Sequence, residues 1–534
     1  MPTTSKRIAL AGLALLALAL VAFLLLRPQR PVLPPAKAQE LGVQMASAAR
    51  DNQLKRMYEL VDSGANLDAR SPDGTPALHW LARRNLADDV DRLLDLGANA
   101  GLTNEYGLTP LHVAAEFGAS AVLRRLLRAG APVDTLSHTG QTALMIAAGE
   151  GDGANVKALL AAGANPNFTD KAYGQTPLML AVRGGSVEAV QALIEAGANV
   201  NAATKLGKKP EFRAPGEGGG SHGDGIVRGG VPPEGSRAEW PGKITPLHLA
   251  AREGTVDMAK ALVEAGAKIE QPEANDARPL LVAVLNDNVP VAQYLLDKGA
   301  NPNAADWYGR TPLWAAVDVR NMELDTDTAK QKGVDRPRAL KFIGALLNKG
   351  ANPNARVMRY PPTRFWLLTA GSLSWVDFTG QTAFLRAALS GDVDAMKLLA
   401  SKGADPNITT NNGTTPLMAA AGINWVFFQT FDEGEDKLLE AVRLCHERFG
   451  QDLNATNAMG LAAVHGAANR GSNKILAYLA SKGARFDIRD AEGRTPYTWA
   501  KGVFLATTAA EPKPESMKLI EQVCARTGQS CGIN

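Results

Sequence analysis

A glycine that follows a leucine-rich stretch recurs along this chain at nearly constant intervals, usually within Gly-Ala-Asn or Gly-Ala-Asp. From Gly64 to Gly197 the steps are 33, 33, 33 and 34 residues, and the last step, from Gly450 to Gly483, is again 33. A fixed period of this length is typical of repeat proteins, in which each unit buries its apolar face against its neighbours. The 534 residues therefore need not divide into several compact domains.

A second recurring element, Gly-x-Thr-Pro or a variant of it, precedes each predicted pair of helices, with clear copies at Gly107 and Gly174. In the first copy Thr109 suits a helix N-cap and Pro110 suits the first helical turn. Gly130, at the end of the second predicted helix, suits a left-handed C-cap. The pattern predicts two helices and a loop in each repeat.

The 33-residue period, together with the sequence Thr-Pro-Leu-His, closely resembles the ankyrin repeat over roughly residues 41–528. Eleven glycine anchors agree in register, which makes the resemblance specific. It implies an all-α ankyrin-repeat solenoid of about eleven repeats, each a helix-turn-helix plus a hairpin loop, followed by a C-terminal cap and a tail at 529–534. In that family the histidine ties neighbouring backbones together, so the resemblance implies a structural role for His79, His112, His248 and His465.

Residues 1–40 differ in character from the repeats. The run from Ile8 to Leu26 has 19 residues and no charge, which is close to the length that crosses a bilayer and longer than the usual signal-peptide core of about 7 to 15 residues. Prolines then form a spacer. We expect one N-terminal transmembrane helix or signal anchor, with the repeats in a bacterial periplasm. The alternative is a secreted or periplasmic protein, cleaved near Ala36-Lys37-Ala38.

Four insertions interrupt the repeat register. They fall near residues 204–243, 321–338, 356–378 and 422–435, and add 36, 18, 20 and 14 residues to the period. The first is rich in glycine and proline, which is typical of a loop at a hairpin tip. The second is expected between the two helices of one repeat.

Two of the insertions, and the segment just before them, are unusually aromatic. One hypothesis is that these side chains fold back and cover the core of the solenoid. The other is that they form a surface for a protein partner, because Trp and Tyr are enriched in binding hot spots. The candidate partner-binding residues are Trp307, Tyr308, Trp314, Tyr360, Phe365, Trp366, Trp375, Trp425, Phe427 and Phe428.

The remaining sequence offers little support for catalysis or for cofactor binding. The net charge is only +3, which gives no basic footprint for nucleic acid. Gly218 begins a match to GxGxxG and Gly219 a match to GxSxG, but neither has the flanking strand and helix that those motifs need. No metal-binding histidine pair and no small-molecule substrate site is evident, so we expect no enzyme activity.

Three cysteines are present: Cys445, Cys524 and Cys531. The last two lie close together near the C-terminus, either as unpaired thiols in a frayed tail or as a disulfide. A disulfide would require an oxidising compartment.

These features favour a protein–protein interaction scaffold or adaptor, membrane-anchored or exported, with an unidentified protein partner. The alternative is an accessory subunit that lacks chemistry of its own and holds a membrane or periplasmic oxidoreductase.

Overall fold

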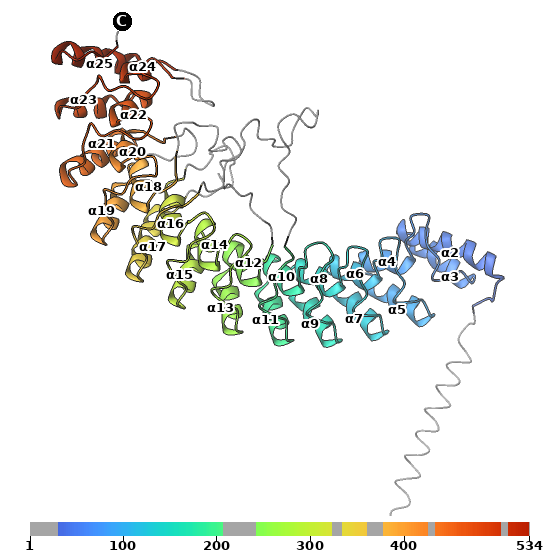
Figure 1. The fold of residues 1–534 in the computed structure, drawn as a ribbon. Coiled ribbons are helices and arrows are strands. Elements are labelled where there is room, and N and C mark those ends of the chain that lie inside the picture. The colour runs from blue at the N-terminus through green and yellow to red at the C-terminus, as the bar shows by residue number, and fades with distance from the viewer. Residues whose placement is uncertain are drawn as a thin grey trace, which may run out of the picture. The chain divides into compact units, whose positions relative to one another are not determined.

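The structure is a computed structural model, and it describes residues 30–206, 242–322, 334–359, 377–425, 433–503 and 511–532. The chain forms two compact units, residues 1–172 and residues 173–534, and each is considered by itself below. Within the described ranges the secondary structure is helical, and the only β feature is an isolated bridge between Arg70 and Pro76. The expected all-α repeat fold is therefore confirmed (Figure 1).

The first unit contains four helix pairs, each joined by a short turn (Figure 1). The helices are α2 (Pro35–Arg50), α3 (Leu54–Asp62), α4 (Ala77–Arg83), α5 (Ala87–Asp95), α6 (Pro110–Glu116), α7 (Ser120–Arg128), α8 (Ala143–Gly149) and α9 (Gly153–Ala161).

The second unit continues the same alternation and ends with the pair α24 and α25, where the C-terminal cap is expected. Its helices are α10 (Pro177–Arg183), α11 (Val187–Glu195), α12 (Pro246–Glu253), α13 (Val256–Glu264), α14 (Pro279–Leu285), α15 (Val289–Asp297), α16 (Pro312–Arg320), α17 (Arg336–Asn348), α18 (Ala383–Leu389), α19 (Val393–Ser401), α20 (Pro416–Ala421), α21 (Glu435–Arg443) with a π-helical turn η2 (Leu444–Arg448), α22 (Ala463–Arg470), α23 (Asn473–Ser481), α24 (Pro496–Ala500) and α25 (Pro514–Thr527).

The repeat consensus explains why the helices begin and end where they do. The Thr109 hydroxyl accepts from the backbone N–H of His112, and the imidazole Nδ1 of His112 accepts from the backbone N–H of Thr109 at 3.1 Å, which is a reciprocal capping box. Pro110 fills the first position of α6. After α7, Gly130 has φ +78°, a conformation that favours glycine.

Three of the four repeat histidines, His79, His112 and His248, also connect successive repeats, as the family resemblance implies. Nε2 of His79 donates to the carbonyl of Leu108 at 2.8 Å, and Nε2 of His248 donates to the carbonyl of Ala277 at 3.2 Å. Burial removes these rings from water and lowers the pKa of His79 and of His248 to about 4. The rings are therefore neutral at pH 7 and act as structural hydrogen-bonding groups.

The hairpin loops are joined by a ladder of backbone hydrogen bonds. In the first unit the N–H of His138 donates to the carbonyl of Tyr106 at 3.1 Å. In the second unit the N–H of Met358 donates to the carbonyl of Tyr308 at 2.8 Å, and the N–H of Asn411 donates to Thr379 at 2.8 Å. Because the ladder uses backbone atoms only, the side chains at the hairpin tips are left free to vary.

The described chain begins against the first repeat. The first helix starts at Pro35, before the expected start of the array at residue 41, because a proline is well accommodated in the first turn. The Arg30 guanidinium donates to the carbonyl of Val61 at 2.9 Å, so this residue of the expected spacer lies against α3, and the last residues of the spacer, from Pro35, belong to α2. Among the described residues, every helix is too short or too polar to cross a bilayer; the run from Ile8 to Leu26 lies outside them.

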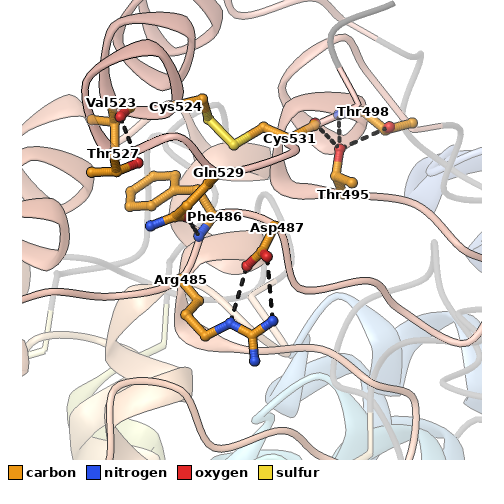
Figure 2. Close-up of a disulfide and its surroundings, with 10 residues drawn as sticks. All are labelled: Arg485, Phe486, Asp487, Thr495, Thr498, Val523, Cys524, Thr527, Gln529 and Cys531. Carbon is orange, nitrogen blue, oxygen red and sulfur yellow. Dashed lines mark hydrogen bonds and ion pairs between the residues drawn. A yellow bond between two sulfur atoms is a disulfide. The ribbon is translucent and has the colours of Figure 1, made fainter.

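The C-terminal segment folds back onto the last helix pair (Figure 2). Cys524 on α25 forms a disulfide with Cys531, and their Cα atoms are 6.2 Å apart. The Thr495 hydroxyl, at the start of α24, donates to the carbonyl of Cys531 at 2.7 Å. Gln529 accepts from the backbone N–H of Phe486 at 2.6 Å. Three contacts therefore hold the segment that follows α25.

Candidate functional site

The four insertions leave the repeats at two kinds of position. The insertion near 204–243 leaves a hairpin, because the N–H of Thr204 donates to the carbonyl of Ile244 at 2.9 Å across its base. The insertion near 356–378 also leaves a hairpin, since Gly380 donates to Val357 at 2.7 Å. The other two lie between the paired helices α16 and α17 and between α20 and α21. The central parts of all four lie outside the described residues.

Two of these insertions are tied together at their bases. Asn424, directly after α20, donates from its side chain to the carbonyl of Asp377 at 2.9 Å and accepts from the N–H of Asp377 at 3.2 Å. Asn424 is fully buried and has φ +68°, a left-handed conformation that Asn tolerates better than most residues. The end of the insertion near 356–378 is therefore fixed beside the start of the insertion near 422–435.

A buried ionic network holds the bases of the two inter-helix insertions. At its centre the Asp392 carboxylate accepts from Arg320 at 2.7 and 3.1 Å and from the side chain of Asn321 at 3.0 Å. Arg336, at the start of α17, lies 3.7 Å from the same carboxylate and also forms an ion pair with Glu433. The bases of the insertions near 321–338 and 422–435 therefore share one charge cluster.

A second buried arginine completes this network. The Arg386 guanidinium on α18 donates to Asp318 at 2.7 Å, to the Ser390 hydroxyl at 2.8 Å and to the carbonyl of Asn321 at 2.8 Å. The carbonyl of Ser390 accepts from the N–H of Glu433 at 3.2 Å. Each charged group has an opposite charge or a hydrogen bond, as buried charges require.

The chemistry of this cluster is structural. Burial raises the pKa of Asp392, but the hydrogen bonds and charge of Arg320, with the contacts of Asn321 and Arg336, outweigh it and hold the pKa below its usual value. The carboxylate is therefore ionised at neutral pH and fully engaged, which leaves no proton acceptor for catalysis. Among the described residues there is also no group of His, Cys, Asp and Glu side chains that could hold a metal ion.

Two of the aromatic candidates are part of the repeat core. Tyr308 is 2% exposed and Trp314 is 4% exposed. Trp314 stands at the position of the repeat histidine, since Thr311 caps α16 by accepting from the backbone N–H of Trp314 at 3.3 Å. For these two side chains the packing hypothesis describes the structure, and they have little surface to offer a partner.

Two other candidates are half-buried at the surface. Trp307 lies under the Arg359 guanidinium, 4.2 Å from the ring centroid. Trp425 packs beside Phe378 on the core cluster that contains Leu385, and Arg470 lies 4.7 Å from its ring. Each ring therefore has one face against protein and part of its edge exposed, which is compatible with either hypothesis.

The other six aromatic candidates lie outside the described residues, so their role as partner-binding residues stays a prediction. They are Tyr360, Phe365, Trp366, Trp375, Phe427 and Phe428.

The buried ionic network was not predicted from the sequence. Arg386 occupies a position at which other repeats have an apolar residue, such as Val113. An arginine at this core position was the one sequence feature that indicated a buried charge. Its partner Asp318 lies 68 residues away in the preceding repeat, so no local pattern connects the two.

A family model described as "Ankyrin repeats (3 copies)" matches residues 45–137, 120–204, 247–325 and 360–426. These ranges together cover more than half of the chain. The chain belongs to the ankyrin-repeat family.

Curated relatives share parts of the array. The putative palmitoyltransferase ZDHHC13 of Danio rerio is 34% identical over 181 residues, which are 34% of this chain and 22% of that protein. Ankyrin repeat domain-containing protein 63 of Mus musculus is 28% identical over 197 residues, 36% of this chain and 39% of that protein. The chain thus spans less than half the length of either relative. Among solved structures, the ankyrin repeat domain of Bcl-3 is 25% identical, over 46% of this chain and 94% of that chain, with a TM-score of 0.35.

Proposed function

We propose that this chain is a non-catalytic scaffold that binds a protein partner. The proposed surface lies in the second unit, where the described ends of the insertions near 321–338, 356–378 and 422–435 are joined by hydrogen bonds and an ion pair. Membership of the ankyrin-repeat family makes a protein the expected ligand. The observation that carries the proposal is the pair of hydrogen bonds between Asn424 and Asp377, because it joins the end of one aromatic insertion to the start of another.

The repeat fold itself does not need this construction. Other repeats pass from one helix to the next through short turns, as α6 passes to α7. Ordering longer connections costs conformational entropy, and burying charges such as those of Arg320 and Asp392 costs desolvation energy. We infer that the entropic and desolvation costs are offset in function, because the insertions provide a surface that binds a protein.

Affinity capture of the full chain, extracted from membranes with mild detergent, tests the proposal. We expect a specific protein to be retained by the unmodified chain and lost from Asn424→Gly, which keeps the left-handed backbone but removes both side-chain hydrogen bonds. The matched control is Asn85→Gly, because Asn85 has the same kind of conformation, φ +56°, in a turn without an insertion. Equal retention by both variants would contradict the proposed surface.

The identity of the captured partner separates the scaffold from the accessory-subunit alternative. A captured chain with a flavin, haem or metal spectrum would favour the oxidoreductase accessory role. Absence of any specific protein, from several preparations of the unmodified chain, would contradict both.

We also propose that the run from Ile8 to Leu26 anchors the chain and that the repeats lie in an oxidising compartment such as the periplasm. The length of the run and the disulfide between Cys524 and Cys531 support this location. Reporter fusions after Lys37 test it: activity of a reporter that works only in the cytoplasm would contradict export.

A further inference from the structure

The first unit contains a pocket of about 270 Å³ between α4 and α6. Its apolar walls come from Trp80 on α4 and from Val113 and Phe117 at α6. Phe117 is 47% exposed, and the residue 33 positions later in the next repeat is Glu150. The repeat therefore does not need an aromatic side chain at this place, and the exposed ring forms a wall of the pocket.

The start of α4 lacks the threonine N-cap of other repeats, and two residues of its first turns, His79 and Trp80, line the pocket. Thr75-Pro76 comes one residue earlier than in the other repeats, so Pro76 stands at the N-cap and offers neither a hydroxyl nor an N–H to His79. Nδ1 of His79 and the indole N–H of Trp80 are both buried without a hydrogen-bond partner. Native proteins usually provide a hydrogen-bond partner for such buried groups. Two residues that line this pocket therefore each carry a polar atom without one.

Arg83 gives the pocket a fixed positive charge. Its guanidinium lies 5.0 Å from the ring centroid of Phe117 and 5.8 Å from that of Trp80. Within the described ranges Arg83 forms no ion pair, although it lines the same pocket as Glu116. A guanidinium that contacts two aromatic rings can still direct its N–H groups outward, where a carboxylate can accept two parallel hydrogen bonds.

We propose that this pocket binds a segment of a protein partner that places a large apolar side chain between Trp80 and Phe117 and an adjacent acidic side chain on Arg83. The proposal rests on the proposed scaffold function and adds a second contact site to it. The acidic side chain is placed on Arg83 because its guanidinium contacts both rings that would hold the apolar side chain, whereas Glu116, which lines the same pocket, opposes this preference.

Fluorine NMR of the full chain labelled with 5-fluorotryptophan tests the proposal. The chain has eight tryptophans, and the Trp80 signal is identified as the one lost in Trp80→Phe. The probes are three capped tetrapeptides that differ only in the third residue: acetyl-Ala-Phe-Glu-Ala-amide and the same peptide with Gln or Lys in place of Glu. We expect the Glu peptide to shift the Trp80 signal saturably, with the Gln peptide about fivefold weaker and the Lys peptide weaker still.

Two variants check the assigned roles. Arg83→Gln should reverse the preference and bind the Gln peptide about two- to threefold more tightly than the Glu peptide, because Glu116 remains. Glu116→Gln should bind the Glu peptide about two- to threefold more tightly than the unmodified chain does, because a like charge is removed. Both residues are exposed, so the melting temperature should not change. Failure of all three peptides to move the Trp80 signal would overturn the proposal, as would tightest binding of the Lys peptide.

Partner capture separates this inference from the scaffold proposal. The double variant Arg83→Gln with Phe117→Ala should retain clearly less partner than the unmodified chain. Undiminished retention would overturn the pocket inference and leave the scaffold intact, whereas the scaffold fails only if the unmodified chain itself captures no specific protein.

Discussion

Asn424 and Asp377 exchange two hydrogen bonds, one donated and one accepted by the amide side chain of Asn424, across 47 residues of sequence. A single side chain therefore joins the described ends of two insertions. A primary amide is needed here, because a carboxylate would accept the N–H of Asp377 but could not donate to its carbonyl.

Replacing Asn424 should therefore show graded effects on stability. We expect Asn424→Gly, which loses both hydrogen bonds, to lower the free energy of unfolding by about 2 kcal/mol. Asn424→Asp should lower it further, because it buries a carboxylate that faces the carbonyl oxygen of Asp377. Urea titration measures both changes, and a smaller loss in Asn424→Asp than in Asn424→Gly would contradict this account of the site.

Asp392 should be among the most sensitive charged positions of the second unit. Asp392→Ala leaves the buried guanidinium of Arg320 without its counter-ion, which we expect to cost about 3 to 5 kcal/mol. Asp394→Ala is the matched control, because Asp394 is exposed in the first turn of α19, two residues after the N-cap Asp392. Denaturant midpoints of the two variants should differ widely; similar midpoints would show that the network adds no stability.

Buried histidines should make stability fall with mild acid. Since burial lowers the pKa of His248 to about 4, from 6.5 in a free side chain, only the unfolded chain takes up a proton between these values. Stability is therefore complete above about pH 6.5 and is lost as the pH falls toward 4.

For His248 alone the loss between pH 7 and pH 5 should be roughly 2 kcal/mol. Urea titrations at both pH values, on the chain and on His248→Gln, measure it. The variant should lose less stability than the unmodified chain over this interval, and an unchanged loss would contradict the assignment.

The disulfide between Cys524 and Cys531 should protect the last helix pair. The loop that it closes is short, so we expect Cys531→Ser to cost about 2 kcal/mol, at the low end of the usual range. Hydrogen exchange in α25 measures the local effect. Because burial raises the pKa of the Cys445 thiol, the native non-reduced chain should react with no thiol reagent; labelling of Cys524 or Cys531 would contradict the bond.

The loss of stability on replacing an aromatic residue should depend on how deeply its side chain is buried. Trp314→Ala should lower the free energy of unfolding by about 3 to 5 kcal/mol, because it leaves a cavity in the core. Trp307→Ala should cost only about 1 kcal/mol, the size of its contact with Arg359. If Trp307 meets the partner, the second variant should also retain less of it; full retention would assign Trp307 to packing alone.

The periodic part of this fold could be predicted from the sequence because the same helix-capping residues recur in successive repeats. Thr109, Pro110 and Gly130 determine where helices start and stop by local interactions, so a short sequence window contains the information. The position of the insertions followed from the same register, by counting residues between glycines. The start of α2 was placed too late, at residue 41 instead of Pro35, because its repeat lacks the Thr-Pro-Leu-His sequence that marks where a helix begins.

The candidate sites were less predictable because they depend on contacts between distant residues. Arg320 and Asp392 are 72 residues apart, and neither stands out in its own repeat. Nδ1 of His79 is left without a partner because Ala77 separates Thr75-Pro76 from Leu78-His79, which places Pro76 rather than a threonine at the N-cap. Burial of Tyr308 and Trp314 likewise could not be distinguished from exposure by composition alone.

The ion pair between Arg336 and Glu433 has a consequence for how this array unfolds. It joins the pair α16 and α17 to the pair α20 and α21, and so passes over the pair between them. In a one-dimensional solenoid each repeat is coupled only to its nearest neighbours, so melting can proceed as a front that advances one repeat at a time. A next-nearest coupling favours joint melting at this place: we expect the three repeats from α16 to α21 to unfold together, with the boundary between folded and unfolded chain at the edges of this block.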